Sequence, residues 1–126
     1  MMKIFFITPF PNIINSILGE SMLSKAKEKG KVEYNVINLF DFLDNPKDRI
    51  DDYPFGGGDG MILKPAPIFK AFRSIKDTAD RVIFPSPDGK ILNHDISMEL
   101  SKEKTLVFIC GHYKGIDQRI RDNIIT

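Results

Sequence analysis

Hydrophobic and polar positions alternate along the chain in blocks that predict strands and helices in turn. Lys3–Thr8 is a nearly continuous apolar run, which predicts a buried strand. Asn12–Lys29 carries apolar residues at helical spacing and stops at Gly30, a residue type that commonly ends helices. Val32–Leu39 alternates as a second strand, and the polar, glycine-rich stretch Phe40–Gly60 predicts a long loop.

The second half of the chain continues this alternation. Pro65 and Pro67 predict the start of a helix that runs to about Lys76. Its apolar positions share one face, namely Ile68, Phe72 and Ile75. The remaining predicted elements are a strand at Arg81–Phe84, a short helix around His94–Leu100 and a strand at Thr105–Cys110.

Strands that alternate with helices predict an α/β fold, with a parallel sheet and helices on both of its faces. Loops that leave the carboxyl ends of parallel strands are where such folds bind ligands. Pro85–Gly89 follows the third strand and Gly111–Gly115 follows the fourth. The sequence therefore predicts a ligand crevice between these two turns.

Composition narrows the class of protein. The 126 residues suit a single domain, and the one cysteine, Cys110, excludes an internal disulfide and any multi-cysteine metal site, which favours a reducing cytoplasm. The sequence contains no run of eighteen apolar residues, so it predicts no membrane-spanning helix. The formal net charge of +1 lacks the strongly basic signature of an autonomous nucleic-acid binder, so any RNA contact must be local or shared with further sequence.

The most specific string is Asp51–Met61, which reads Asp-Asp-Tyr-Pro-Phe-Gly-Gly-Gly-Asp-Gly-Met. Four glycines in five positions allow a close backbone approach to a ligand or partner. A glycine-rich stretch taken alone is more often a flexible surface loop than a binding site. It is not a phosphate-binding P-loop either, because no Gly-Lys-Ser/Thr sequence follows it. The order of paired aspartates, an aromatic residue, three glycines and Gly-Met is what makes the string specific.

Two further strings follow the predicted third and fourth strands. The prolines of Pro85–Lys90 leave backbone groups unpaired by the sheet and suited to reading the edge of an adenine ring, although an ordinary β-turn explains this string equally well. In Cys110–Arg119, glycines let a cofactor lie against bare backbone, and Asp117 could pair with Arg119 or with a neighbouring subunit. In isolation, His112 is more often a polar loop residue than a catalyst, and Cys110 reads as a small buried hydrophobe.

Taken together, the strings resemble the bacterial tRNA (guanine-N(1))-methyltransferase family of the knotted SPOUT class. Asp51–Met61, Ser86-Pro87 with Gly89, and Gly111–Arg119 match its motifs in the family's order, and Phe6–Pro11 matches its start. The resemblance implies a homodimer that binds S-adenosylmethionine and methylates ring nitrogen 1 of the guanosine 3′ to the tRNA anticodon. The cofactor contacts that it implies are Phe84, Pro85, Ser86, Pro87, Gly111, Tyr113 and Gly115, and the substrate contacts are Asp51, Gly58 and Gly60.

The resemblance also implies what residues 1–126 lack. They correspond to the N-terminal part of a SPOUT methyltransferase domain, without the knot-forming segment and the C-terminal helical tRNA-binding domain. The general-base aspartate of the family is expected beyond Thr126, so we expect no catalytic residue in this chain and no activity from it alone. Lys114 stands where the family has a glutamate linked to Mg²⁺ dependence, and it places a positive charge beside a cationic cofactor.

The same residues leave two alternatives to a segment of a tRNA methyltransferase. A non-catalytic module that retains dimerisation and weak cofactor binding would account for Lys114 and for the end of the chain. A Rossmann-type dinucleotide enzyme is disfavoured, because Thr8–Pro11 follows the first strand where a glycine fingerprint would be needed.

Overall fold

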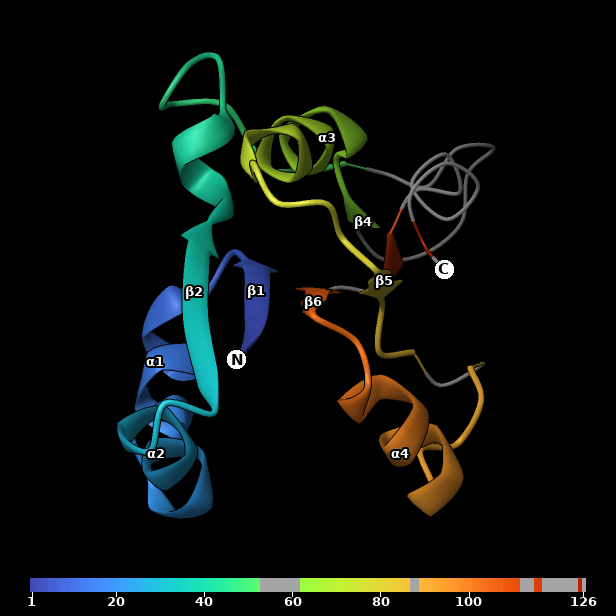
Figure 1. Cartoon of the computed structure of the whole chain (residues 1–126). Coiled ribbons are helices and arrows are strands. Elements are labelled where there is room, and N and C mark those ends of the chain that lie inside the picture. Colours follow the sequence, from blue (N-terminus) through green and yellow to red (C-terminus); the bar gives the residue numbers. More distant parts are fainter. Residues whose placement is uncertain (53–61, 87–88, 112–114, 117–124, 126) are drawn as a thin grey trace.

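The computed structural model describes residues 1–52, 62–86, 89–111, 115–116 and 125. Its main sheet has four parallel strands in the order β2-β1-β6-β5 (Figure 1). In chain order these strands are β1 (Met2–Thr8), β2 (Val32–Asn38), β5 (Arg81–Ile83) and β6 (Thr105–Ile109). The predicted parallel sheet is confirmed.

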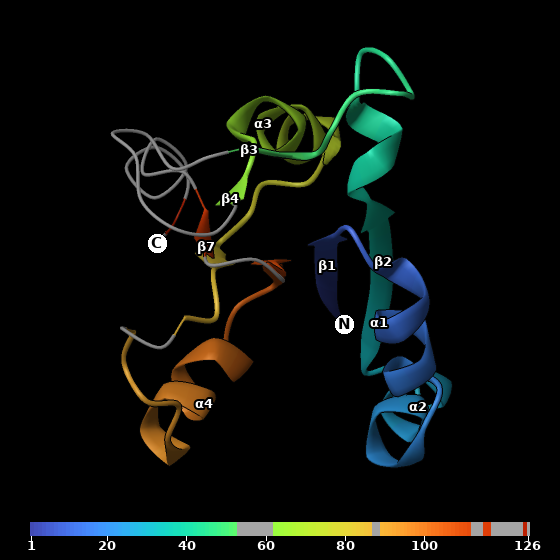
Figure 2. The same ribbon diagram turned by 180° about the vertical axis from the view of Figure 1, so that it is seen from behind.

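Helices lie on both faces of this sheet, as the sequence predicts. They are α1 (Pro11–Leu18), α2 (Ser21–Glu28), the 3-10 helix η1 (Leu39–Phe42), α3 (Pro65–Ser74) and α4 (His94–Ser101). In the strand order, the connection from β1 to β2 runs toward one edge of the sheet, and the connection from β2 to β5 runs toward the other edge. Right-handed crossovers in opposite directions place their helices on opposite faces, so α3 lies on the face opposite α1 and α2. In Figure 1, α3 lies above β5 and β6 and α4 lies below them, and Figure 2 shows α1 in front of β2.

The core lies between the sheet and α3. Ile7 of β1 pairs with Ile109 of β6, and both are buried together with Val107. From the helix side, Ile68 and Ala71 complete the cluster. Each fully buried aliphatic side chain of this kind contributes about 1.5–3 kcal/mol. The predicted apolar face of the helix is confirmed, since Phe72 and Ile75 also pack against the cluster.

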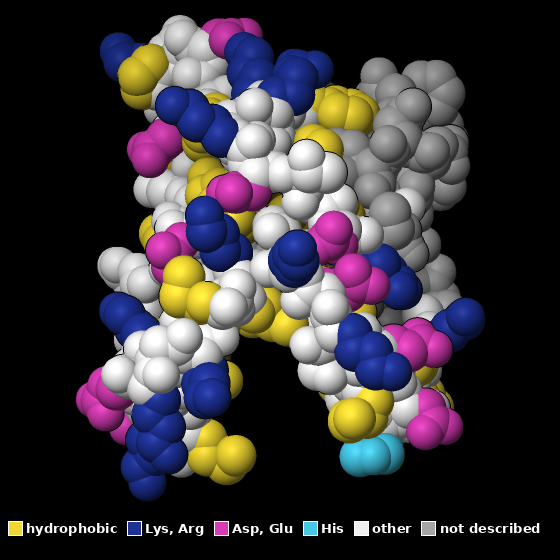
Figure 3. Space-filling view, viewed as in Figure 1, with side chains coloured by type: hydrophobic (Ala, Val, Ile, Leu, Met, Phe, Trp, Pro, Cys, Tyr) yellow, Lys and Arg dark blue, Asp and Glu magenta, His cyan; other side chains and the backbone are white. Residues whose placement is uncertain are grey.

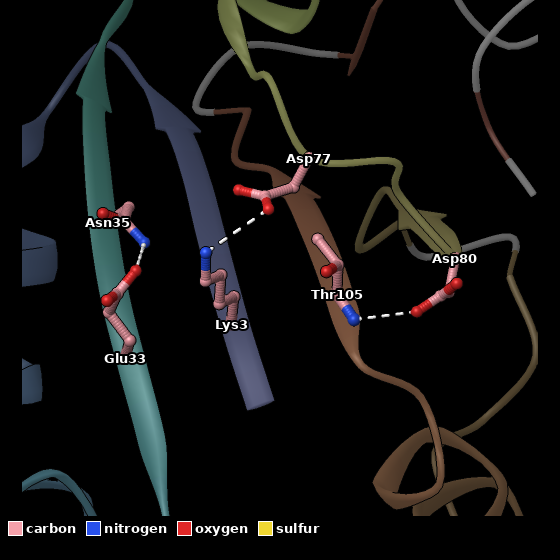
Figure 4. Close-up of polar contacts among 6 residues, drawn as sticks. All are labelled: Lys3, Glu33, Asn35, Asp77, Asp80 and Thr105. Carbon is pink, nitrogen blue, oxygen red and sulfur yellow. Dashed lines mark hydrogen bonds and ion pairs between the residues drawn. The ribbon is translucent and has the colours of Figure 1, made fainter. Parts of the chain in front are cut away.

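Side-chain contacts tie the start of β5 to its neighbours. The carboxylate of Asp80 accepts the backbone N–H groups of Lys104 and Thr105 at 2.9 and 2.8 Å, which joins the approach to β5 with the start of β6 (Figure 4). Lys3 of β1 forms an ion pair with Asp77 at 3.3 Å across the same region (Figure 4). These contacts hold β5 and β6 in the register that brings their carboxyl ends together.

The single helix predicted for Asn12–Lys29 is wrong, because the structure has two. α1 ends where the N–H of Gly19 bonds to the carbonyl of Asn15, and Glu20 is extended with ψ of 148°. A glycine in a helix interior lowers the stability of the helix by about 1 kcal/mol, so Gly19 is a favourable position for the helix to end. The break lets both short helices contact β2.

The predicted stop at Gly30 is confirmed and has a clear physical cause. Gly30 has φ of +70°, a left-handed conformation that favours glycine. The N–H of Gly30 bonds to the carbonyl of Lys27, and the N–H of Lys31 bonds to that of Ala26. This pair of bonds is the Schellman motif that satisfies the last carbonyl groups of a helix.

The stretch predicted as one loop, Phe40–Gly60, contains regular structure. η1 covers Leu39–Phe42, and β3 (Asp51–Asp52) pairs with β4 (Ile62–Leu63) in a small second sheet. Residues 53–60 of the predicted loop lie outside the described part of the chain. Among the helices that the structure describes, none is long and apolar enough to cross a membrane.

Candidate functional site

The carboxyl ends of β5 and β6 form one end of the candidate site. The two strands are parallel neighbours, and Ile83 pairs with Phe108. The chain continues from β5 into Phe84, Pro85 and Ser86, and from β6 into Cys110 and Gly111. The two turns that the sequence singled out therefore leave the same edge of the sheet side by side.

A close approach between Phe84 and Gly111 defines the contact of these turns. A Cβ atom added to Gly111 would lie 3.2 Å from Cε1 and 3.7 Å from Cζ of Phe84. The phenyl ring therefore lies against bare backbone, and a side chain at position 111 would force it to shift. Phe84 also packs against the core, which limits how far the ring can move.

The turn after β5 is closed by a backbone hydrogen bond. The N–H of Gly89 donates to the carbonyl of Ser86 at 3.2 Å, the pattern of a β-turn. Both the β-turn interpretation and the predicted position at the sheet edge are thus correct. They do not compete, because the turn begins at Ser86, which lies three residues after the end of β5.

Cys110 continues the β6 ladder rather than offering a nucleophile. Its N–H donates to the carbonyl of Ile7 at 2.9 Å. Burial raises the pKa of the Cys110 thiol above its ordinary value, because desolvation disfavours the thiolate. The thiol is therefore protonated at neutral pH, which agrees with the prediction of a residue without special reactivity, although Cys110 is half-buried rather than buried.

The second sheet connects the two halves of the candidate site. β4 pairs with β3 on one side and with β7 (Gly115–Ile116) on the other. Asp52 and Gly115 are both paired with Ile62, so two strand spacings, or about 10 Å, separate the two outer strands. The expected substrate contact Asp51 and the expected cofactor contact Gly115 are thereby held in one three-stranded sheet.

Asp51 is held in place by its backbone and by a neighbouring guanidinium. It is buried to 8% exposure, and its backbone pairs with that of Leu63. Its carboxylate accepts Nε of Arg49 at 3.3 Å, while the Arg49 side chain remains 71% exposed. An ion pair with so exposed a partner contributes about 0–1 kcal/mol, so the strand pairing rather than Arg49 fixes the position of Asp51.

The contact between Arg49 and Asp51 was not predicted from the sequence. The sequence offered no strand pattern that would have predicted it, because Arg49 lies outside β3 and β3 has only two residues.

Several expected site residues lie outside the described part of the chain. They are Gly58, Gly60, Pro87, His112, Tyr113, Lys114, Asp117 and Arg119. Within the described residues, no group of three His, Cys, Asp or Glu side chains is arranged to hold a metal ion.

Comparison with known proteins gives a consistent result over the length of the chain. The family model described as tRNA (Guanine-1)-methyltransferase TrmD matches residues 2–126. A tRNA (guanine-N(1)-)-methyltransferase of Staphylococcus epidermidis is 45% identical over 126 residues, which are 99% of this chain and 51% of the relative. The corresponding protein of Bacillus subtilis is 44% identical over 128 residues, covering 99% of this chain and 53% of the relative.

A solved structure shows the same fold. The tRNA (m1G37) methyltransferase from Aquifex aeolicus superposes with a TM-score of 0.88 at 36% sequence identity, over 99% of this chain and 57% of that one. The chain thus spans about half the length of the curated relatives that it matches.

Proposed function

The chain belongs to the tRNA (guanine-1)-methyltransferase family, and from this membership we propose that it forms part of a longer protein that methylates tRNA. The proposed reaction transfers a methyl group from S-adenosylmethionine to ring nitrogen 1 of the guanosine 3′ to the anticodon. Residues 1–126 would supply the N-terminal part of the methyltransferase domain. A C-terminal helical domain would supply further tRNA contacts.

The contact between Phe84 and Gly111 is the observation that best supports a cofactor site in this chain. Cofactor binding against backbone needs a position without a side chain, and Gly111 is an exposed glycine at the edge where β5 and β6 end, with the Phe84 ring on the side where a Cβ would point. We propose that the cofactor is held by Phe84, Pro85, Ser86, Gly111 and Gly115, with Pro87 and Tyr113. Bound there, S-adenosylmethionine would supply an electrophilic methyl group.

Asp51 is proposed to bind the guanine base. An ionised carboxylate only accepts hydrogen bonds, and the N–H groups on the Watson–Crick edge of guanine are donors. β3 fixes the backbone of Asp51, and β4 connects it to the strand of Gly115. Gly58 and Gly60 would allow the base to approach the backbone closely. These residues contribute positioning, which is the larger part of a methyl transfer to a ring nitrogen.

Proton removal is assigned to a group outside this chain. A general base must reach the reacting ring nitrogen within hydrogen-bond distance. Asp51 is proposed as a binding group, and the base is expected from an aspartate beyond Thr126. Mg²⁺ is proposed only as a possible further requirement of the reaction.

We propose a cytoplasmic homodimer, and the outer side of α1 supports the dimer. Leu18 of α1 is buried against the fold, whereas Ile13 and Ile17 are 59% and 54% exposed. They are four residues apart and share one side of a helix that contains no charged residue. Ile13 and Ile17 continue the apolar stripe of α1 beyond the part that the fold buries, and an apolar stripe of a helix is usually covered. A second copy of α1 fits, because an uncharged surface can meet itself without repulsion.

A non-catalytic module is the second candidate, and Lys114 is the observation that favours it. A lysine in place of an acidic residue places like charge beside the sulfonium of the cofactor, which disfavours its binding. Such a module would dimerise and bind the cofactor weakly without transferring the methyl group.

Calorimetry and radiolabelled methyl transfer separate these functions. We expect the chain to bind S-adenosylmethionine, and we expect transfer only when the reading frame that follows Thr126 is included. The substrate is an unmodified tRNA transcript, and a transcript with adenosine in place of the target guanosine is the control. Asp51→Asn should reduce transfer to the guanosine transcript, because the amide replaces a carboxylate oxygen with a donor. If the extended protein transfers no methyl group, the proposed methyltransferase function fails and the non-catalytic module is the remaining candidate.

A further inference from the structure

The residues from Lys64 to Lys76, which include α3, carry only positive charge. From Lys64 to Lys76 the chain has three lysines and one arginine and no aspartate or glutamate. One side of the helix is buried through Ile68 and Ala71. In Figure 3, Lys and Arg side chains gather at the top of the molecule, over α3 and the loop beside it.

The nearby carboxylates neutralise only one of these four cations. Asp44 pairs with Lys70, whereas the two other carboxylates in ion pairs near the helix, Asp77 and Asp51, are paired with Lys3 and Arg49. No carboxylate of the described part of the chain pairs with the remaining three cations. These three residues, which we call the α3 cations, are Lys64, Arg73 and Lys76.

Acidic residues do lie nearby, but on a separate segment. Asp41 is on η1, and Asp48 is on the loop that follows it. The segment is mixed in charge, because Lys47 and Arg49 lie on the same loop, whereas the residues from Lys64 to Lys76 carry positive charge alone.

Helix stability does not explain this arrangement. Cations in the last turn of a helix interact favourably with its dipole, which accounts for Arg73 and equally for Lys25 and Lys27 of α2. Lys64 is the N-cap residue of α3, where the same dipole disfavours a positive charge. A cation that works against the helix it precedes indicates a partner outside the helix.

The α3 cations begin at the proposed guanosine site. The N–H of Lys64 donates to the carbonyl of Ile50 at 2.8 Å, directly beside the pair of Asp51 and Leu63. From there the ten residues of α3 extend about 15 Å, and the chain continues to Lys76. The α3 cations therefore extend from a residue beside the pair of Asp51 and Leu63 to the end of α3 and the chain that follows it.

We propose that the α3 cations bind phosphate groups of the tRNA strand next to the target guanosine. This inference rests on the proposed function, because it takes tRNA as the partner and Asp51 as the guanine contact. Lysine acts as a point charge toward phosphate, and the planar guanidinium of Arg73 can donate two parallel hydrogen bonds to it. Contacts of this kind position the strand and carry no sequence information.

The test measures tRNA binding to the 126-residue chain as a function of salt. Fluorescence anisotropy with a labelled, unmodified transcript gives the slope of log K against log [salt]. The variant is Lys64→Gln/Arg73→Gln/Lys76→Gln. The control, Lys25→Gln/Lys27→Gln/Lys29→Gln, removes three charges from exposed residues at the end of α2. Thermal unfolding of both variants confirms that each is folded.

The α3 variant should bind more weakly and give a slope that is shallower by about 2–3, because each lost phosphate contact removes roughly 0.7–0.9. The α2 variant should keep the slope of the wild-type chain. Equal slopes for the two variants, or no salt-dependent binding by the wild-type chain, would overturn the inference.

A second transcript separates this inference from the proposed function. Replacing the target guanosine by adenosine should leave the difference in slope unchanged, since phosphates are the same in both. Suppose that the difference in slope persists, but the extended protein methylates the adenosine transcript as well as the guanosine transcript. The phosphate contacts are then supported, and the proposed specificity for guanosine fails. If the difference disappears with the adenosine transcript, the contacts depend on the base and the inference is wrong.

Discussion

The phenyl ring of Phe84 lies in the space that a side chain at position 111 would need, with Cε1 at 3.2 Å from the Cβ that Gly111 lacks. Phe84 follows β5 and Gly111 follows β6, so this contact joins the ends of two neighbouring strands. It is the tightest constraint that the described residues place on the proposed cofactor site.

Gly111→Ala should therefore weaken binding of S-adenosylmethionine. The added methyl group displaces the ring by a few tenths of an ångström and covers backbone that the cofactor is proposed to contact. We expect about a tenfold loss of affinity, or roughly 1.4 kcal/mol, in calorimetry. Gly19→Ala is the control, because the added Cβ there would lie at an ordinary 3.5 Å from Asn15 O, in α1. Equal affinities for the two variants would argue against cofactor contact at position 111.

Asp80→Ala should destabilise the fold more than Asp77→Ala. Asp80 accepts two backbone N–H groups at the start of β6, and hydrogen bonds to a charged acceptor contribute about 1.5–3 kcal/mol each when buried. Because Asp80 is exposed, we expect a loss of about 1–3 kcal/mol in total. Asp77 forms an ion pair whose two side chains are 37% and 40% exposed, so its loss should cost about 0–1 kcal/mol. Urea denaturation measures both, and the opposite ranking would contradict the structural role of Asp80.

Alkylation of Cys110 should be slow at neutral pH in the folded protein. Burial raises the pKa of its thiol, so the midpoint of the rate against pH should lie higher in the native chain than in the chain unfolded in urea. Because of the same shift, the contribution of the Cys110 thiol to the free energy of unfolding is fully present below the pKa of the unfolded thiol. It is lost as the pH rises through the pKa of the native thiol. A native midpoint at or below the unfolded one would disprove the assignment of a structural thiol.

Ile13→Asp/Ile17→Asp should abolish self-association if α1 forms the dimer surface. Two carboxylates on each helix would place like charges opposite one another across a two-fold axis. Sedimentation equilibrium should show a monomer for this variant. Ile91→Asp/Leu92→Asp is the control, since these side chains are even more exposed, at 86% and 67%, but lie on a loop. A monomeric wild-type chain would contradict the proposed dimer.

Prediction from the sequence succeeded where a long periodic pattern or a specific turn residue was present. The predicted strands Lys3–Thr8 and Val32–Leu39 differ by one residue at one end from β1 and β2, and Gly30 ends α2 as predicted. The prediction failed at Gly19, where one glycine inside a helical pattern did not reveal the break. Glycine weakens a helix by only about 1 kcal/mol, so packing on β2 decides whether the helix continues.

The candidate site shows the same division. The turns that contain Ser86 and Gly111 were predicted from their prolines and glycines, because these residues specify turns locally, whereas the cofactor contacts of Phe84, Ser86 and Gly111 were implied only by the family resemblance. The pairing of β3, β4 and β7 was not foreseen, since two-residue strands have no periodicity of their own. The carboxylate partner Arg49 was missed for the same reason.

By itself, the sequence determined the α/β class, the positions of the main strands along the chain and the family, because each depends on local patterns or on residue strings. Only the tertiary structure decided that β5 lies beside β6, that Phe84 therefore contacts Gly111, and that β4 joins Asp51 to the strand of Gly115. These relationships depend on contacts between residues far apart in the chain. Their free energy comes from burying the core between α3 and the sheet, which no single segment can do alone.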